Sequence, residues 1–310
     1  MITGRAGVAA TLIVTSSWPR TRDEVAGTFV RADAIARLRE GRVVVAAPDG
    51  PGDARGGYGL EVVDVPHAGL FGTPGAPARL LAAPHRIVGL LPFHAAVARL
   101  ARAVRPDRVV AHWLLPAGAI ACALDGEIEA IAHGGDVRLL EAMPSALSRA
   151  FLSRLASRAR IRAVSPGIAA RLRAMAPDLP VVVSPMPVAE HALETARAHG
   201  ARIRARLGGD LHVVAARMVA SKRIERAVPH IAARGGRLVL IGDGPERERL
   251  MREARRAAVE VIATGAVAHE QALAWIAAAD QVIAPLARGE GAPTVVREAE
   301  ALGVPVVVLA

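Results

Sequence analysis

Short apolar runs rich in β-branched residues alternate along this chain with longer stretches in which apolar positions repeat at helical spacing. The run at residues 9–16 (AATLIVTS) predicts a buried first strand. A polar loop then ends at Gly27, and a helical pattern at residues 28–40 precedes a second strand that begins at Val43. Arg5 in front of the first run also allows a secretory signal, but the run is short and no convincing small-residue cleavage site follows it. The pattern therefore favours a β-loop-α-β unit.

The same alternation continues beyond a Gly/Pro-rich insertion at residues 48–58 and a second loop-rich stretch at residues 67–85. Residues 93–104 suit an amphipathic helix. Further strands are predicted at residues 60–65, 108–111, 128–132, 161–164 and 181–184, with helical patterns between the later ones. This spacing favours a parallel, doubly wound sheet.

Residues 184–210 break the rhythm, because two prolines precede a basic helix-like stretch that closes at Gly208-Gly209. A second α/β series follows. Its strands are predicted at residues 211–216, 237–241, 259–263, 281–285 and 304–309, and its helices at 221–233, 245–257, 269–279 and 293–302. We therefore predict an α/β chain of two Rossmann-like domains, residues 1–188 and 189–310, whose sheets face a cleft at the carboxyl ends of their strands.

Composition excludes several classes of protein. A chain of 310 residues that is 52% hydrophobic can fill one large core or two ordinary ones, which excludes disorder and a disulfide scaffold. Cys122 is the only cysteine, so we expect a reducing cytosol and no Cys-rich metal set. No apolar run reaches the roughly 18 residues that would indicate a membrane span.

A net charge of +10 is typical of proteins that bind a polyanion, but the distribution of charge argues against nucleic acid as the partner. Only 3% of residues are aromatic, no recognition motif occurs, and the cations are spread over both halves. All but one of the 39 basic residues are arginine. The single lysine, Lys222, is informative because arginine serves equally well as a generic surface charge, whereas a compact ammonium suits a phosphate.

A basic region at residues 138–173 holds eight arginines against one acid, Glu141. Leu147, Phe151 and Leu155 repeat there at helical spacing. One interpretation is a basic amphipathic face that lies on anionic lipid, which would place a cytoplasmic protein at the inner face of the membrane. The other is a helix that packs on its own sheet while its arginines are solvated.

A pair of cations follows the first predicted strand of the second series. Arg217 stands at the end of that strand, and Lys222 follows five residues later where a helix is predicted to begin. Two cations at a strand-to-helix turn, with free backbone N–H groups nearby, suit a diphosphate. The alternative is two solvated surface charges.

A second candidate is the run at residues 288–300, in which Glu290 precedes a glycine turn and Pro293 begins a helix. The backbone N–H groups that this turn would direct into the cleft belong to Gly291, Ala292 and Thr294. Glu298 lies on the helix, so both glutamates could reach hydroxyls of one ligand. The alternative is that Glu298 pairs with Arg297 or Arg288 and that Glu290 is an ordinary loop carboxylate.

Gly242-Asp243-Gly244 follows the strand at residues 237–241 and is half of a dinucleotide fingerprint. No third glycine follows, and no acidic residue ends the next strand at the required distance. A Rossmann dehydrogenase is therefore disfavoured.

The order and spacing of these motifs resemble the nucleotide-sugar domain of the family-four (group 1) retaining glycosyltransferases, which have the GT-B fold. The motifs that carry the resemblance are Arg217-Met-Val-Ala-Ser-Lys222, Ile241-Gly-Asp-Gly-Pro245, Gly265-Ala-Val267, Ala279-Asp280, Pro285-Leu286, Glu290-Gly-Ala-Pro293 and Glu298-Ala-Glu-Ala-Leu-Gly-Val-Pro-Val-Val307. They span residues 210–308. The first half is similar more loosely, through Gly27-Thr-Phe29-Val30, Ala132-His133-Gly134-Gly135-Asp136 and Ala163-Val-Ser165.

The resemblance implies a role for each matching position of the second half. Arg217 and Lys222 would hold the donor diphosphate and stabilise the leaving group, and Glu298 would contact the ribose. Glu290 would hold the donor sugar together with the N–H groups of Gly291, Ala292 and Thr294, in the turn that contains Pro293.

In the first half, the resemblance implies that Gly27 lets its loop approach the phosphates. His133 would lie near the sugar and the acceptor, with Asp136 and His112 as weaker candidates on the acceptor side. The alternative for His133 is a core histidine whose polar atoms bond to backbone.

The implied activity is retaining transfer of a sugar from a nucleotide sugar, such as a UDP- or GDP-sugar, to a hydroxyl of a glycan, a lipid-linked acceptor or a small molecule. Polysaccharide biosynthesis in the cytoplasm would be a natural setting. No cofactor and no metal is expected, and the chain has neither an Asp-x-Asp motif nor a His/Cys set with ligand spacing.

Two departures from the family pattern stand out. Arg223 follows Lys222 where the family usually has glycine, and the chain ends at Ala310, soon after a strand beyond which family members continue. The C-terminal domain thus looks shortened. The alternative function is accordingly a catalytically inactive or incomplete GT-B scaffold that binds a nucleotide or a protein partner.

Overall fold

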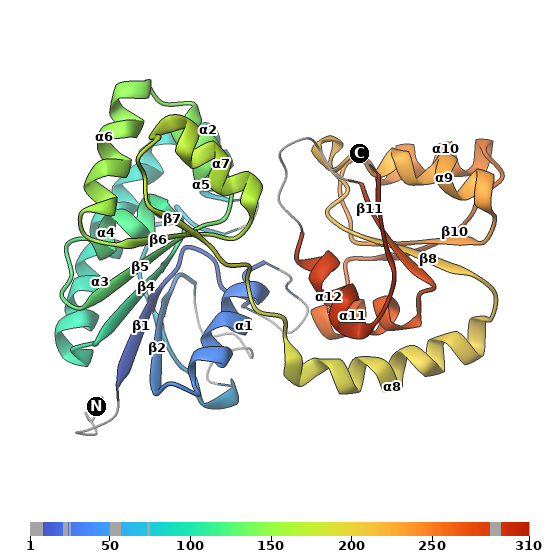
Figure 1. Cartoon of the computed structure of the whole chain (residues 1–310), viewed down its shortest axis with the longest axis horizontal. Coiled ribbons are helices and arrows are strands. Elements are labelled where there is room, and N and C mark those ends of the chain that lie inside the picture. The colour runs from blue at the N-terminus through green and yellow to red at the C-terminus, as the bar shows by residue number, and fades with distance from the viewer. Residues whose placement is uncertain are drawn as a thin grey trace. The chain divides into compact units, whose positions relative to one another are not determined.

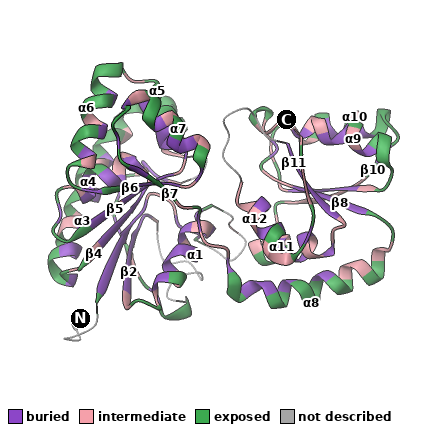
Figure 2. Ribbon diagram, viewed as in Figure 1, coloured by how far each residue is buried: buried purple, intermediate pink, exposed green. Residues whose placement is uncertain are grey.

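The computed structural model describes residues 9–20, 24, 26–49, 57–72, 75–285 and 293–309. The chain divides into two compact units, the first ending at Pro187 and the second beginning at Val188 (Figure 1). Each unit holds one parallel sheet, and most strand residues in both sheets are buried or half-buried (Figure 2). The predicted fold class, two α/β units with parallel sheets, is confirmed.

The first unit contains a seven-stranded sheet in the order β3-β2-β1-β4-β5-β6-β7. Its elements are β1 (Ala10–Val14), α1 (Thr28–Arg37), β2 (Arg42–Ala47), β3 (Glu61–Asp64), α2 (Ala76–Ala82), α3 (Leu90–Val104), β4 (Arg108–His112), α4 (Ala119–Ala121), β5 (Glu127–Ala132), α5 (Gly135–Glu141), α6 (Ser145–Ala156), β6 (Arg160–Ala163), α7 (Pro166–Met175) and β7 (Val181–Val183).

Strand β1 lies in the middle of this sheet, paired with β2 on one side and β4 on the other. All five of its residues are buried because both of its faces are covered. Successive side chains of a strand point to opposite faces. Accordingly, Leu12 lies in the same apolar core as Phe93 of α3, whereas Ile13 lies in the core that contains Val30 of α1.

The loop predicted at residues 67–85 is the largest difference from the expected elements of this unit. Helix α2 lies there, and a 3-10 segment at Pro84–Gly89 runs directly into α3, which begins at Leu90 rather than Phe93. Helix α2 was missed because Pro77 and the glycines that precede the helix indicate a loop. The proline falls in the first turn of α2, where its missing N–H costs no hydrogen bond.

Among the described residues, the stretch Pro84–Val104 is long and apolar enough to cross a membrane by length and composition alone. This differs from the expectation that no such run exists. The inner face of α3 packs into the core through Phe93, Val97 and Leu100.

The second unit holds a five-stranded sheet in the order β10-β9-β8-β11-β12. Its elements are α8 (Glu190–Leu207), β8 (Leu211–Ala215), α9 (Ala227–Arg234), β9 (Arg237–Ile241), α10 (Arg247–Arg256), β10 (Glu260–Gly265), α11 (His269–Ala278), β11 (Gln281–Pro285), α12 (Thr294–Leu302) and β12 (Val306–Leu309). The basic stretch that interrupts the sequence pattern is α8, which packs along α11.

Two helix predictions in this unit were wrong in detail. The helix expected at residues 221–233 is two 3-10 turns, Ala220–Lys222 and Ile224–Arg226, followed by α9. Pro293 does not lie inside α12, because its extended backbone makes it the residue that precedes the first turn. Both differences change where the N–H groups near the candidate site lie.

The basic region at residues 138–173 is built mainly from α5, α6 and α7. Of the three apolar residues expected on one face of α6, Leu155 is buried and Phe151 is half-buried, but Leu147 is 55% exposed. Ser148 and Leu152 complete the buried face instead. The helix therefore packs on its own domain through a seam one residue away from the predicted one.

Candidate active site

Each sheet has a point at which the order of its strands reverses, and open α/β sheets bind ligands outside the carboxyl ends of the strands there. In the first unit this point lies between β1 and β4, and in the second between β8 and β11. Gly27 follows β1, His112 ends β4, and Arg217 follows β8. The segment after β11 contains Glu290, Gly291 and Ala292, which lie outside the described residues.

Gly27 forms the turn that starts α1. Its φ of 82° is left-handed, a conformation that side chains disfavour. A Cβ at this position would lie 2.8 Å from both Ser17 O and Trp18 Cα. The backbone therefore requires glycine, and it brings the loop after β1 close to the first turn of α1.

Two histidines stand side by side at the ends of β4 and β5. His112 is fully buried, and its Nδ1 lies 3.1 Å from Nε2 of the half-buried His133. The two rings stack with centroids 5.2 Å apart, and Phe29 of α1 covers His133 at 4.9 Å. The structure thus brings together Phe29, His112 and His133, which the sequence places far apart, and Gly27 lies two residues before Phe29.

Asp33 of α1 is a residue of this site that sequence reasoning missed. Its carboxylate is buried, with Oδ2 3.3 Å from Nε2 of His112 and 2.7 Å from Nε of Arg37. Burial alone would raise the pKa of Asp33, but His112 and the guanidinium groups of Arg37 and Arg162 outweigh it and hold that pKa well below its usual range. The available signal was an acid at helical spacing from Val30, inside the buried stripe of α1.

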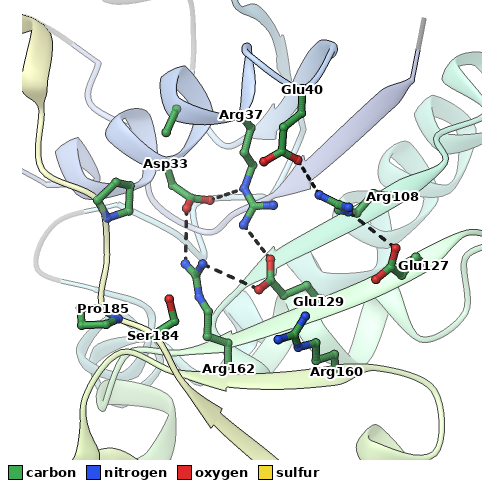
Figure 3. Close-up of a pocket in the computed structure, with 12 residues that line it drawn as sticks. Asp33, Arg37, Glu40, Arg108, Glu127, Glu129, Arg160, Arg162, Ser184 and Pro185 are labelled. Carbon is green, nitrogen blue, oxygen red and sulfur yellow. Dashed lines mark hydrogen bonds and ion pairs between the residues drawn. The ribbon is translucent and has the colours of Figure 1, made fainter.

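A groove of about 380 Å³ opens on the other side of this carboxylate. Figure 3 shows Arg37 and Arg162 lying between Asp33 and Glu129 in this groove. Arg37 donates to Glu129 at 2.6 Å, and Arg108 at the rim donates to Glu40. Because Arg37 and Arg162 both pair with Asp33 and Glu129, these charges hold Asp33 in place.

Burial lowers the pKa of His112, although Asp33 opposes the shift. Burial also lowers the pKa of His133 well below its ordinary value, and the neighbouring His112 and Arg162 add to that effect. Both rings are therefore neutral at pH 7. A neutral imidazole carries one N–H and one acceptor nitrogen, so each ring can donate one hydrogen bond and accept another.

Asp136 holds the loop that carries His133. Its buried carboxylate accepts hydrogen bonds from the backbone N–H groups of Leu114, His133, Gly134 and Val137. Burial raises the pKa of Asp136, and those N–H groups oppose the rise. This geometry gives Asp136 a structural role, and direct contact with an acceptor stays a prediction.

In the second unit, Arg217 is exposed and Lys222 is half-buried, both in the segment that joins β8 to α9. Lys222 ends the first 3-10 turn, and Arg223 after it has a left-handed backbone with φ 48° and ψ 35°. This is the position at which the family usually has glycine. The departure therefore keeps the glycine-like backbone and adds a side chain to it.

The Gly242-Asp243-Gly244 turn fixes the segment that carries Arg217. Met218 N–H donates to Asp243 O, and a Cβ on Gly244 would lie 2.4 Å from Met218 O. A Cβ on Gly242 would lie 2.2 Å from Ala216 O. The two glycines thus serve close backbone packing.

Glu298 is buried on α12 and accepts a hydrogen bond at 2.7 Å through Oε1 from Nε2 of His269, at the start of α11. The alternative was an arginine partner for Glu298; the structure gives it His269 rather than Arg297, and Arg288 lies outside the described residues. Thr294 is the first residue of α12, so its N–H group is one of those left free at the helix start. Within the described ranges no cluster of three or more His, Cys, Asp or Glu side chains could hold a metal ion, and metal independence stays a prediction.

Residues 211–310 match the family model described as glycosyl transferases group 1. The match covers most of the second unit, which is therefore similar to a group 1 glycosyltransferase domain. The resemblance inferred from its motifs is therefore confirmed. A search of curated proteins finds no match to the chain.

Solved structures of glycosyltransferases share the fold of the whole chain. Sucrose-phosphate synthase from Thermosynechococcus elongatus is similar with a TM-score of 0.71 and 17% identity, over 97% of this chain and 81% of that one. HepE from Anabaena, in complex with UDP and glucose, is similar with a TM-score of 0.70 and 16% identity, over 96% and 80%. A trehalose-phosphate synthase from Burkholderia xenovorans gives 0.67 and 14%, over 97% and 84%. These likenesses show that the chain has the GT-B fold.

Proposed function

We propose that this chain transfers a sugar from a nucleotide-diphosphate-sugar donor to a hydroxyl acceptor, with retention of configuration and without a metal. The observation that carries the proposal is the group 1 match over residues 211–310, with Arg217 and Lys222 beside the point where the strand order reverses. A UDP-sugar is the first donor to test, because the structure of HepE in complex with UDP-glucose has the same fold.

Departure of the nucleoside diphosphate develops negative charge on its β-phosphate. In the proposed mechanism, Lys222 and Arg217 neutralise that charge, and the N–H group of Thr294 at the start of α12 adds a donor. Fixed cations in a site sheltered from water stabilise such a charge more strongly than water does. Lys222, Arg217 and the N–H group of Thr294 can therefore stabilise the charge of the leaving phosphate, a role that a metal ion has in other enzymes.

Glu298 is proposed to bind the ribose. Its pairing with His269 through Oε1 fixes the carboxylate, and Oε2 is the oxygen proposed to accept from a ribose hydroxyl. Glu290 keeps its proposed role at the donor sugar by resemblance alone.

The tautomers of the histidine pair indicate a role for His133. The carboxylate of Asp33 favours a proton on Nε2 of the neutral His112, which leaves Nδ1 as an acceptor. His133 then donates from Nε2 to that nitrogen, so its own Nδ1 is an acceptor. We propose that this nitrogen orients a hydroxyl of the donor sugar or the acceptor.

Retention without a covalent intermediate is consistent with the carboxylates near this pair. Asp33 and Asp136 are buried, and both are held by hydrogen bonds or ion pairs. Neither is placed as a free nucleophile. Front-face transfer from the donor is the proposal that follows.

The direct test incubates the chain with UDP-, GDP- and other nucleotide sugars in the presence of EDTA and measures release of the nucleoside diphosphate. We expect turnover, a product of unchanged anomeric configuration by NMR, and a loss of about a hundredfold or more in kcat/KM for Lys222→Ala. The control is Arg255→Ala, which removes an exposed cation from α10 of the same domain. Absence of both hydrolysis and transfer with every donor would favour the inactive scaffold.

A further inference from the structure

The segment between Asp64 and Asp107 contains no acidic residue, whereas it contains five arginines. A second acid-free segment of the first unit lies between Glu141 and Asp178 and contains seven arginines. Outside these two segments acids and arginines often pair, as Arg42 does with Glu61. An acid-free segment of this length has a positive potential of its own. The segment between Asp64 and Asp107 encodes α2, the 3-10 segment at Pro84–Gly89 and α3.

Four large apolar side chains are exposed within eleven residues of this segment. Leu81 is 86% exposed, Ile87 48%, Val88 56% and Leu91 73%. Elsewhere in the described parts of the chain, exposed large apolar side chains are scattered singly or in pairs. Single exposed apolar residues are ordinary, but a cluster marks an interaction surface.

The backbone explains why these side chains cannot turn inward. Helix α3 already buries the face that carries Phe93 and Val97 against the sheet. Leu91 and Ala95 lie on its opposite face, and Arg99 and Arg102 continue that exposed face toward the end of the helix. The exposed side of the segment is thus apolar at one end and cationic at the other.

The charge decides between possible occupants of this surface. A second copy of the chain, docked symmetrically, would place the same arginines opposite one another without any acid between them. An anionic bilayer offers the complementary charge together with an apolar layer for the leucine and isoleucine side chains. Arginines can extend their guanidinium groups to phosphates while their stems lie along apolar surface.

We propose that residues 76–102, which we call the α2–α3 patch, dock the first unit on an anionic bilayer surface, with Arg86, Arg99 and Arg102 on lipid phosphates. The patch is an interfacial contact rather than a membrane span, because the inner face of α3 stays in the core. It goes beyond the proposed transfer reaction, since it assigns the first unit a partner other than the donor and the acceptor.

The patch also replaces the basic region at residues 138–173 as the lipid contact. Arginines of that region already have partners in the protein: Arg171 donates to Glu141 at 2.7 Å, Arg173 to Val181 O, and Arg158 to Leu124 O. Its exposed apolar residues are Leu139 and Leu147 only. They supply the matched control.

The test is flotation of the full chain with vesicles of phosphatidylcholine, alone or mixed with phosphatidylglycerol. We expect binding to the mixed vesicles only, weakened at high salt, and a loss of about tenfold or more in the double variant Ile87→Gln/Leu91→Gln. The double variant Leu139→Gln/Leu147→Gln should bind as the wild type does. Circular dichroism checks the fold. The single variants Ile87→Gln and Leu91→Gln are measured in parallel, so that vesicle binding can still be compared with the wild type if the double variant does not fold.

Three outcomes would overturn the proposal. The wild type could fail to bind phosphatidylglycerol vesicles, or the patch variants could bind unchanged. Alternatively, light scattering could show a dimer that Ile87→Gln/Leu91→Gln dissociates while vesicles are not bound, which would make the patch a subunit interface.

Discussion

Arg223 occupies a backbone conformation that disfavours its own side chain. Its φ of 48° and ψ of 35° are left-handed, and this conformation costs an L-residue about 1–2 kcal/mol relative to glycine. The turn is nonetheless required, because Lys222 ends one 3-10 turn and Ile224 begins the next. The strain is thus confined to a residue beside a proposed phosphate ligand.

We expect Arg223→Gly to stabilise the chain by about 0.5–1 kcal/mol, after the greater freedom of glycine in the unfolded chain is subtracted. Arg223→Ala keeps the Cβ and removes the same charge, so it should leave stability nearly unchanged. Urea unfolding of the three proteins measures the difference. Equal stability of the glycine and alanine variants would show that the left-handed turn is not strained in solution.

Asp33 lies between two buried arginines and His112. Asp33→Asn keeps the shape of the side chain but leaves the charges of Arg37 and Arg162 less compensated, so we expect a loss of about 3–5 kcal/mol. Glu40→Gln removes the same charge from an exposed pair with Arg108 and should cost less than about 1 kcal/mol. Chemical unfolding compares the two, and similar losses would contradict the buried network.

At the scale of elements, the crossing of α8 and α11 depends on one small residue. A Cβ on Gly200 would lie 2.7 Å from Cβ of Ala277 and 2.9 Å from Ala274 O. These atoms belong to a packed helix, which cannot yield without a shift of the whole crossing.

Gly200→Ala is therefore expected to destabilise the second unit by about 1–2 kcal/mol, although alanine favours helix over glycine by about 1 kcal/mol. Gly135→Ala on α5 is the matched control, because nothing lies within 4 Å of its Cβ position. It should leave the protein as stable or slightly more stable. A thermal melt in which Gly200→Ala is the more stable variant would disprove the close crossing.

The strands could be predicted nearly to the residue, as β9 and β11 show, because apolar runs buried on both faces differ sharply from their flanks. Helix α9 was placed too early because nothing in the sequence marks Arg223 as left-handed. The roles of Asp33 and His269 could not be predicted for another reason. Their partners His112 and Glu298 come from distant segments of the chain, and only the folded structure brings such segments together. The proposed phosphate ligands Arg217 and Lys222 could be named from the sequence because both lie in the one segment that joins β8 to α9, and their role stays a prediction.

At the scale of the whole molecule, the buried histidines make stability depend on pH. Burial lowers the pKa of His112 and His133 in the folded chain below the ordinary value of 6.5, so near pH 6 the unfolded chain binds more protons. The free energy of unfolding therefore falls as the pH falls from about 7.5 to 5.5.

We expect the melting temperature to fall over this range and to fall less in His133→Gln, which removes one of the protons taken up on unfolding. The comparison with the variant is needed because burial also lowers the pKa of His212 in the second unit. Identical pH profiles for the two proteins would mean that His133 is not buried as a neutral ring.

The account rests most heavily on Lys222 as a ligand of the donor diphosphate, at the point where the central strand β8 meets its helix. A hydrogen-bonded charge contact of this kind is worth about 1.5–3 kcal/mol, or roughly ten- to a hundredfold in affinity. The most direct measurement is calorimetric titration of UDP and GDP into the wild type, Lys222→Ala and Arg255→Ala. We predict that one of these nucleotides binds the wild type and Arg255→Ala alike and binds Lys222→Ala at least about tenfold more weakly. Equal affinity for all three proteins would contradict the assignment of Lys222 to the phosphates.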